Sequence, residues 1–302
     1  MTTQSTQRPQ GACAAHTGQG NLGGVQKDTF SFLDDGPDLG GLSQVDLERP
    51  NVARMYDYGL GGAHNFAVDR RQVDLMHRIN PEGPLCPRAN RDFLRRAVQF
   101  CAGQGIDQFL DLGSGLPTVG NVHEVAQEIN PDARVVYVDN EAIAVEHTRR
   151  ILADNDLATI VHADLRQPDT ILAEEETLRL LDFSRPVALL IVAALHYVDT
   201  NPGIVLNRYR DALAPGSYFV GSHLTGDDRP DIMRAIQEKV FSESSTPLTV
   251  RTREEVTALF DGFELVEPGV VYTSDWRPGP EDYQPRIAGE VTMTWAGVGR
   301  KP

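Results

Sequence analysis

The stretch "FLDLGSGLPT", Phe109 to Thr118, is an apolar run that leads directly into a glycine-rich turn. Its first half has the pattern of a buried strand, and Gly113 and Gly115 then allow the backbone to approach a ligand closely. Such a turn also presents N–H groups at the start of the following helix, where ligands often bind. The alternative is a tight strand-to-helix connection without a ligand, and the rest of the sequence bears on this choice.

From Ile106 onward, short apolar strands alternate with helical segments. The expected strands are "IDQFLDLG", "ARVVYVD", "ATIVHAD", "PVALLIVAAL" and "SYFVGSHL". Strands that are apolar throughout and separated by helices are typical of a parallel sheet covered on both faces. The sequence therefore predicts a doubly wound α/β fold, to which "FELVEPGVV" and "EVTMTWAGVG" add an antiparallel pair at the sheet edge.

The chain divides into three expected parts. Residues 1–45 are rich in Gly, Gln, Thr and Asp without an apolar period, so we expect a disordered tail. Residues 46–104 follow, and their apolar periodicity predicts helices that include 68–78 and 88–101. We interpret this segment as an N-terminal helical lid, and residues 105–302 as the ligand-binding domain.

Composition limits the classes of partner. The 302 residues include 28 Lys and Arg against 43 Asp and Glu, a formal net charge of -15 that repels nucleic acid over most of the surface. The three cysteines have no metal-ligand spacing and favour a reduced, cytoplasmic setting. The longest apolar run is about half the length that crosses a bilayer, and the first residues lack the apolar core of a signal peptide. We therefore expect neither membrane insertion nor secretion.

Acidic residues stand at the ends of three successive strands, at positions Asp111, Asp139 and Asp164. Asp139 follows Gly115 by about 24 residues, a distance at which a strand-end carboxylate accepts the hydroxyls of a ribose. The alternative role for Asp139 is the N-cap of the next helix. A dinucleotide fingerprint would place a third glycine where Thr118 stands, so the pattern suits a ribose and a cationic amino acid better than a pyrophosphate.

These motifs resemble those of the class I S-adenosylmethionine-dependent methyltransferases. "FLDLGSGLP" is similar to their glycine-rich first motif, "VYVD" to their ribose-binding acidic end, and "HADLR" to their adenine-side loop. More narrowly, "RPNVARMYDYGLGGAHNFAVDR" resembles an actinobacterial S-adenosyl methyltransferase family that was formerly catalogued as a domain of unknown function. The resemblance covers roughly residues 46–298.

The resemblance implies a Rossmann-like, seven-stranded sheet with S-adenosylmethionine lying across the strand ends. In that arrangement Gly113 and Gly115 face the methionine part of the cofactor, and Asp111 lies near its ammonium group. Asp139 holds the ribose. These positions would make the opening turn a cofactor-binding loop.

Further positions follow from the same resemblance. Asp164 and Leu165 are expected to flank the adenine, whereas Ala193 and His196 border the methyl group that is transferred. The candidates for closing over cofactor and acceptor are Tyr56, Gly61, His64 and Asn65. Of these, we expect Tyr56 and Asn65 to contact the cofactor.

The function predicted from these residues is methyl transfer from S-adenosylmethionine to a small-molecule acceptor. His196 is the best candidate for a base, and its alternative is a structural histidine that bonds the loop backbone. The histidines show no spacing for a metal. Two other functions stay open: a catalytically silent protein that binds S-adenosylmethionine or S-adenosylhomocysteine, and a nicotinamide-dinucleotide oxidoreductase.

Overall fold

The computed structural model describes residues 48–117, 120–198, 201–242, 246–282 and 287–302. The predicted disordered tail, residues 1–45, and Thr118 of the glycine turn lie outside the described residues. Every described residue belongs to one compact unit, Gly40–Pro302. The segment predicted as a lid therefore shares a structural unit with the predicted ligand-binding domain.

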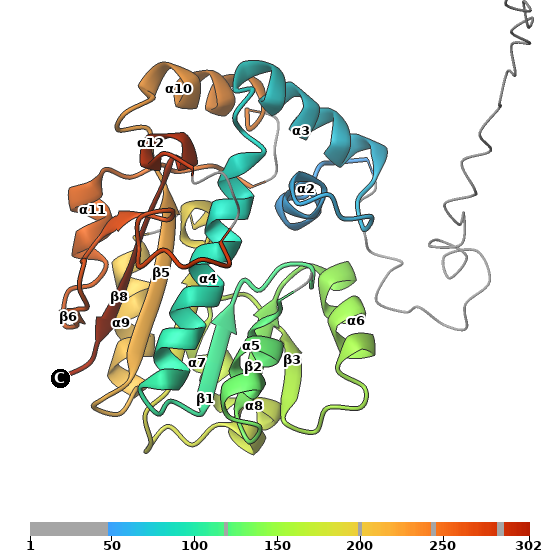
Figure 1. Ribbon diagram of the computed structural model, residues 1–302. Coiled ribbons are helices and arrows are strands. Elements are labelled where there is room, and N and C mark those ends of the chain that lie inside the picture. The colour runs from blue at the N-terminus through green and yellow to red at the C-terminus, as the bar shows by residue number, and fades with distance from the viewer. Residues whose placement is uncertain (1–47, 118–119, 199–200, 243–245, 283–286) are drawn as a thin grey trace, which may run out of the picture. The chain divides into compact units, whose positions relative to one another are not determined.

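A mostly parallel β-sheet forms the centre of this unit (Figure 1). In the described residues it contains eight strands in the order β3-β2-β1-β4-β5-β8-β6, and β7 also pairs with β8. The parallel strands are β1 (Gln108–Leu112), β2 (Arg134–Asp139), β3 (Ala158–His162), β4 (Ala188–Val192) and β5 (Tyr218–Leu224). The predicted doubly wound α/β fold is confirmed.

The edge of the sheet is built from three antiparallel strands. These are β6 (Glu264–Leu265), β7 (Val271–Tyr272) and β8 (Thr294–Arg300). β6 and β7 both pair with β8, Glu264 opposite Arg300 and Val271 opposite Ala296. Pro268 lies between the two short strands and has no N–H for a ladder. The sheet thus has the seven strand positions that were expected, and two short strands, β6 and β7, share the last position beside β8.

Helices cover both faces of the sheet, which is why its strands are apolar on both sides. One face packs against α4, α5 and α6, for example through Phe93 and Val122, and the other against α8, α9 and α11, for example through Leu180 and Leu206. The helices of these two layers are α4 (Leu85–Gly103), α5 (Val122–Ile129), α6 (Ala142–Ile151), α7 (Pro168–Ala173), α8 (Glu175–Leu180), α9 (Pro202–Ala212) and α11 (Arg253–Ala258).

A cap of three helices forms its own apolar cluster at the end of the sheet (Figure 1). The cap consists of α2 (Val52–Gly59), α3 (Ala67–Ile79) and α10 (Pro230–Lys239), which pack together through Met55, Val73, Met233 and Ile236. The predicted lid over residues 46–104 was too long, because α4 packs on the sheet face. Only α2 and α3 from that segment belong to the cap.

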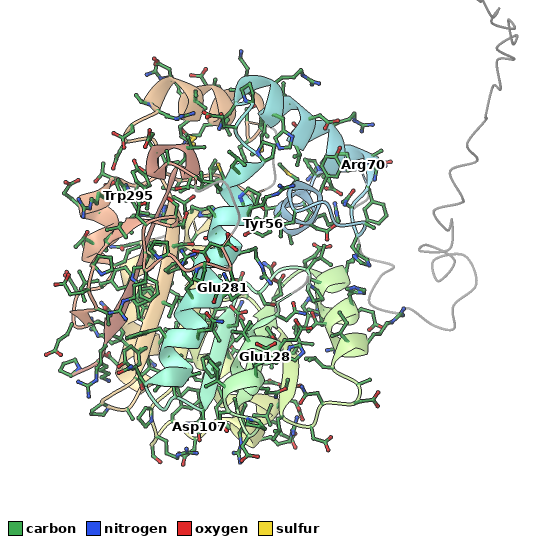
Figure 2. All side chains as sticks on the ribbon, viewed as in Figure 1. Tyr56, Arg70, Asp107, Glu128, Glu281 and Trp295 are labelled. Atoms are coloured by element: carbon green, nitrogen blue, oxygen red, sulfur yellow. The ribbon has the colours of Figure 1, made fainter. Side chains whose placement is uncertain are left out.

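The cap lies over the carboxyl ends of the parallel strands. Figure 2 shows Tyr56 of α2 at this end of the sheet and Asp107, the residue before β1, at the opposite end. Two short elements complete the described chain, the 3-10 helix η2 (Leu195–Tyr197) after β4 and α12 (Gly289–Thr292) before β8. The fold thus places a helical cover above the strand ends where a ligand of such a sheet binds.

Candidate functional site

A cavity of about 420 Å³ lies at the carboxyl ends of β1, β2 and β4, where α2 and α4 contribute to its walls. The walls include every residue predicted to bind a cofactor except Asn65. These residues are Tyr56, Asp111, Gly113, Gly115, Asp139, Asp164, Leu165 and Ala193. The fold therefore brings together side chains that are far apart in the sequence, and we call this space the main cavity.

The glycine turn needs its two glycines for different reasons. Gly113 and Gly115 adopt left-handed conformations, with φ of 73° and 66°. A Cβ atom on Gly113 would lie 2.6 Å from the Cβ atom of Ala194, whereas a Cβ atom on Gly115 would meet no heavy atom within 4 Å. The buried hydroxyl of Ser114 has no hydrogen-bond partner in the described residues. The turn thus presents bare backbone to the main cavity, with the buried hydroxyl of Ser114 beneath it.

Asp139 joins the glycine turn to the end of β2. Its Oδ2 accepts the N–H of Gly115 at 2.7 Å, and its Oδ1 accepts the N–H of Glu141 at 2.8 Å. Burial raises the pKa of the Asp139 carboxyl, and the hydrogen bonds from the backbone oppose that effect. The N-cap of α6 is Glu141, so Asp139 is not the cap that the alternative interpretation required.

Asp111 and Arg91 place a carboxyl group and a guanidinium in the wall of the main cavity. Asp111 is 5% exposed and lies near the end of β1, whereas Arg91 comes from α4. Burial raises the pKa of Asp111 from 3.8 to about 7, while Arg91 lowers it and Asp139 raises it further. Arg91 also donates to the carbonyl of Gly120 at 3.1 Å. A carboxyl group and a guanidinium in one wall suit a zwitterion such as an amino acid.

Asp164 and Leu165 follow β3 and lie in the same wall. The carboxylate of Asp164 accepts two hydrogen bonds from the guanidinium of Arg166 at its Oδ2, at 2.9 and 2.6 Å. Although burial raises the pKa of Asp164, the hydrogen bonds from Arg166 outweigh it, so the net shift is downward. The carbonyl of Leu165 accepts the hydroxyl of Tyr209 at 2.8 Å, which fixes this loop on α9.

A chain of hydrogen bonds links α2, α4, β5 and the end of β4. The amide of Asn90 donates to the hydroxyl of Tyr56 at 2.9 Å, and Tyr56 donates to the carbonyl of Pro87. Oδ1 of Asn90 accepts the hydroxyl of Ser222, which in turn accepts the N–H of Ala193 at 2.9 Å. Ala193 has φ of 58°, which is unfavourable for a residue with a side chain. The chain of bonds holds this strained residue at the cavity wall.

His196 lies in η2, two per cent exposed, and lines a second cavity instead of the main one. Burial lowers the pKa of His196 well below 6.5, and His223 and Arg251 lower it further, so the ring is neutral near pH 7. Its Nδ1 accepts the N–H of Leu224 at 3.4 Å. In a neutral ring whose Nδ1 accepts this bond, the proton is on Nε2, which is then available to donate. The role of His196 as a base stays a prediction, and this arrangement favours a hydrogen-bond donor.

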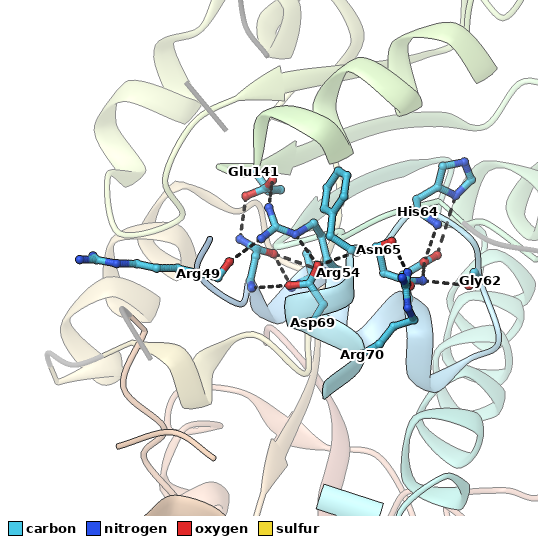
Figure 3. A network of polar contacts seen from close by, with 12 residues as sticks. Arg49, Arg54, Gly62, His64, Asn65, Asp69, Arg70 and Glu141 are labelled. Carbon is cyan, nitrogen blue, oxygen red and sulfur yellow. Dashed lines mark hydrogen bonds and ion pairs between the residues drawn. The ribbon is translucent and has the colours of Figure 1, made fainter. Parts of the chain in front are cut away.

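Asn65 is the predicted cofactor contact that the structure places elsewhere. Its amide donates to the carboxylate of Asp57 at 2.8 Å and to the carbonyl of Gly62 at 2.9 Å, and its Oδ1 accepts Arg70 at 3.1 Å (Figure 3). The N–H of His64 also donates to Asp57, at 2.9 Å. Asn65 thus stabilises the loop between α2 and α3, and it lines neither cavity because its polar atoms are used inside that loop.

A second polar network attaches the cap to the sheet domain, and we call it the latch. Arg54 is 1% exposed and extends between Asp69 of α3 and Glu141 beside α6 (Figure 3). The distances from its guanidinium nitrogens are 2.9 Å to Asp69 and 3.3 Å to Glu141. Asn51 donates to the other oxygen of Glu141 at 2.6 Å. Because Glu141 follows Asp139 by two residues, the latch connects the cap to the predicted ribose site.

Several residues of the site were not predicted from the sequence. Ser114 stands between the two glycines, so its position in the motif was a usable signal. Arg91 and Asn90 belong to α4, and no sequence pattern indicates that this helix passes beside the end of β1. Arg54 is a charged residue in a short amphipathic helix, where exposure is the ordinary expectation.

No group of three or more His, Cys, Asp and Glu side chains in the described ranges is arranged to hold a metal ion. Among the helices that the structure describes, none combines the length and apolar character needed to cross a membrane.

A family model for S-adenosyl methyltransferases matches residues 40–302. The chain belongs to this S-adenosyl methyltransferase family. The match includes the cap, the glycine turn and the whole sheet, so all parts of the site described above fall within the family region. A comparison with curated proteins finds no match.

Two solved protein structures are similar to this chain over most of its length. A candidate methyltransferase from Thermobifida fusca YX is 42% identical, with a TM-score of 0.79, over 84% of this chain and 97% of that one. A DUF574 family protein from Streptomyces avermitilis MA-4680 is 37% identical, with a TM-score of 0.81, over 85% of this chain and 99% of that one. The predicted resemblance to the methyltransferase family is confirmed, and it favours methyl transfer over dinucleotide oxidation.

Proposed function

We propose that the protein transfers a methyl group from S-adenosylmethionine to a small-molecule acceptor. The observation that carries this proposal is the composition of the main cavity in a chain of the S-adenosyl methyltransferase family. The lining holds the carboxyl group of Asp111 and the guanidinium of Arg91, together with the strand-end carboxyl group of Asp139. A zwitterionic amino acid joined to a ribose matches both features.

The described residues fit the cofactor part by part. Asp111 would bind its ammonium group and Arg91 its carboxylate, beside the bare backbone at Gly115 and the unpaired hydroxyl of Ser114. A carboxylate has about four acceptor positions, so Asp139 can accept ribose hydroxyls while it keeps its two bonds to the backbone.

The adenine would lie at the end of β3. Leu165 offers an apolar surface there. Asp164 is already engaged by Arg166, so it keeps little capacity to accept a hydrogen bond from the base. We therefore expect Leu165 to contribute more than Asp164 to adenine binding.

The chemistry needs positioning more than side-chain catalysis. S-adenosylmethionine supplies a methyl group on a sulfonium, which an acceptor nucleophile displaces. The protein aligns the reactants beneath α2, whose Tyr56 lies in the wall of both cavities. His196 would either take a proton from the acceptor, as predicted from the sequence, or donate a hydrogen bond from Nε2 to orient it.

Other properties are proposed on separate grounds. The net charge of -15 supports a small molecule rather than a nucleic acid as acceptor, and we expect no membrane partner. Cys86 and Cys101 are free thiols, which supports a reduced, cytoplasmic setting. A protein that binds the cofactor without turnover would keep the same main cavity, so turnover separates these two functions.

Parallel calorimetric titrations with S-adenosylmethionine, S-adenosylhomocysteine and NAD test the cofactor. We expect both adenosyl compounds to bind and NAD not to bind. Asp139→Asn should weaken binding by about tenfold or more, since it removes a charge-assisted acceptor. The matched control is Asp132→Asn, an exposed aspartate in the loop before β2. Binding of NAD alone would overturn the proposal.

A further inference from the structure

A second cavity of about 120 Å³ adjoins the main cavity between α2, α3, α10 and the end of β5. We call it the apolar chamber. Its walls include Met55 of α2, Met76 of α3, and Met233 and Ile236 of α10. Methionine side chains are flexible and polarizable, and they make favourable contacts with aromatic rings.

The apolar chamber and the main cavity share part of their walls. Val52, Tyr56, Asn90, Ala193 and Tyr197 line both spaces. Of these, Tyr56, Asn90 and Ala193 belong to the hydrogen-bonded chain that runs through Ser222. The boundary between the two spaces therefore includes this polar chain beside the apolar side chain of Val52, whereas the walls farther from it are mostly apolar.

The apolar chamber carries no charge near pH 7. No Asp, Glu, Lys or Arg side chain lines it within the described part of the chain. Its two histidines are His77 and His196, and burial lowers the pKa of each below 6.5. A charged group that entered would lose its hydration without gaining a partner, which is strongly unfavourable.

The volume limits the size of an occupant. Apolar cavities of roughly 150 Å³ take up benzene, while a water molecule accounts for about 30 Å³ of the liquid. A chamber of about 120 Å³ therefore has room for one ring, given small adjustments of its methionines. A fused or heavily substituted ring system would need the walls to move.

We propose that the apolar chamber binds the ring of the methyl acceptor, an uncharged single-ring aromatic compound whose nucleophilic nitrogen or oxygen lies at the Tyr56–Asn90 boundary. This inference rests on the proposed function, because it takes the main cavity as the cofactor site. In the transfer, a lone pair of the acceptor atom forms the new bond to the methyl carbon. The carbon–sulfur bond breaks with its electron pair retained by sulfur, and any proton on the acceptor atom passes to solvent water.

Fluorine NMR with three ring compounds of similar size tests the chamber. The probes are 4-fluoroaniline, which is neutral at about pH 7.5, the anion 4-fluorobenzoate, and the cation formed by 4-fluorobenzylamine. Each is titrated into the free protein and into protein saturated with S-adenosylhomocysteine. We expect 4-fluoroaniline to bind at least about tenfold more tightly than either ion.

Two variants locate the bound probe. Ile236→Phe and Met76→Phe place extra atoms in the chamber from different helices and should each abolish 4-fluoroaniline binding. The matched control is Ile232→Phe, on α10 outside the chamber walls, which should bind the probe as the wild type does. Thermal unfolding identifies a variant that has lost the fold, in which case the other variant decides.

The outcomes separate this inference from the proposed function. Absence of binding by all three probes, equal binding of the ions, or binding that survives both chamber variants would overturn the inference. Failure of S-adenosylhomocysteine to bind would instead overturn the proposed function, and the titration of the free protein would still decide whether the chamber selects an uncharged ring.

Discussion

Replacing Asp111 with asparagine should stabilise the ligand-free protein at alkaline pH and weaken its affinity for the cofactor. Burial raises the pKa of this carboxyl from 3.8 to about 7. At a pH between 3.8 and about 7, the Asp111 carboxyl is ionised in the unfolded chain but still protonated in the folded chain. The wild type therefore loses stability as the pH rises from about 4 to about 7, and the loss is complete above pH 7. Asparagine has a similar shape and does not ionise, so the variant avoids this loss.

The magnitude follows from the two pKa values of Asp111. They differ by about three pH units, and each unit corresponds to about 1.4 kcal/mol, so the full loss is roughly 4 kcal/mol. At about pH 5 the wild type has lost only part of it. The wild type should therefore lose about 3 kcal/mol more of its free energy of unfolding than Asp111→Asn does when the pH is raised from about 5 to about 8.

Urea denaturation at the two pH values measures this gain, followed by the fluorescence of Trp276 and Trp295. Asp107→Asn is the matched control, since Asp107 lies before the same strand and forms an exposed ion pair with Arg185. Such pairs contribute at most about 1 kcal/mol. Calorimetry at about pH 8 should show S-adenosylhomocysteine binding at least about tenfold weaker in Asp111→Asn.

Two results would refute the reasoning about Asp111. An equal difference between variant and wild type at both pH values would mean that burial does not hold the proton on this carboxyl. Stabilisation without loss of S-adenosylhomocysteine affinity would leave the burial argument intact and remove Asp111 from the ammonium site.

Three further predictions follow from the same geometry. Arg54→Met should lower the free energy of unfolding by about 3 kcal/mol, because it leaves the buried carboxylate of Asp69 without its positive partner. The control Arg70→Met, at an exposed arginine of the cap, should lower it by less than about 1 kcal/mol. Equal losses for the two variants in urea denaturation would contradict the stabilising role of the latch. Gly113→Ala should lower the free energy of unfolding by about 3 kcal/mol, because a side chain is unfavourable at this positive φ and its Cβ would overlap Ala194. Gly115→Ala should lower it by about 1–2 kcal/mol and chiefly weaken S-adenosylhomocysteine binding, because only the φ effect applies there. Similar losses for both variants in urea denaturation would argue against the overlap with Ala194. Nitrogen NMR at about pH 6 should show His196 neutral with its proton on Nε2, and a charged ring would contradict the expected burial effect.

The sequence predicts the sheet and the strand-end part of the site well, because both depend on local patterns. Apolar runs such as β4 have no polar face, so they require helices on both sides. Asp111 lies one residue before the end of β1 and Asp139 ends β2; these strands are parallel neighbours, so their carboxyl ends lie at the same edge of the sheet. A chain-local pattern is then enough to place these side chains together.

The helical parts of the site depend on tertiary packing, so local patterns predict them poorly. The apolar stripe of α4 predicts a helix but does not say that it covers the sheet, and thus does not predict Arg91 and Asn90 at the cavity. Asn65 illustrates the opposite error. The family resemblance assigned it to the cofactor, yet its amide donates to Asp57 inside the loop after α2.

The motif "RPNVARMYDYGLGGAHNFAVDR" positions Met55 and Tyr56 through buried ion pairs and hydrogen bonds among its own polar residues. Arg54 and Asp69 attach the cap to the sheet domain, and Asp57 organises the loop after α2. Between these fixed points lie Met55 and Tyr56, of which the first lines the apolar chamber and the second lines both cavities. Buried ion pairs contribute little net stability, but they define a single geometry when every partner is bonded. The motif therefore holds α2 above the strand ends and fixes Tyr56 at the boundary of the two cavities, where we propose that cofactor and acceptor meet.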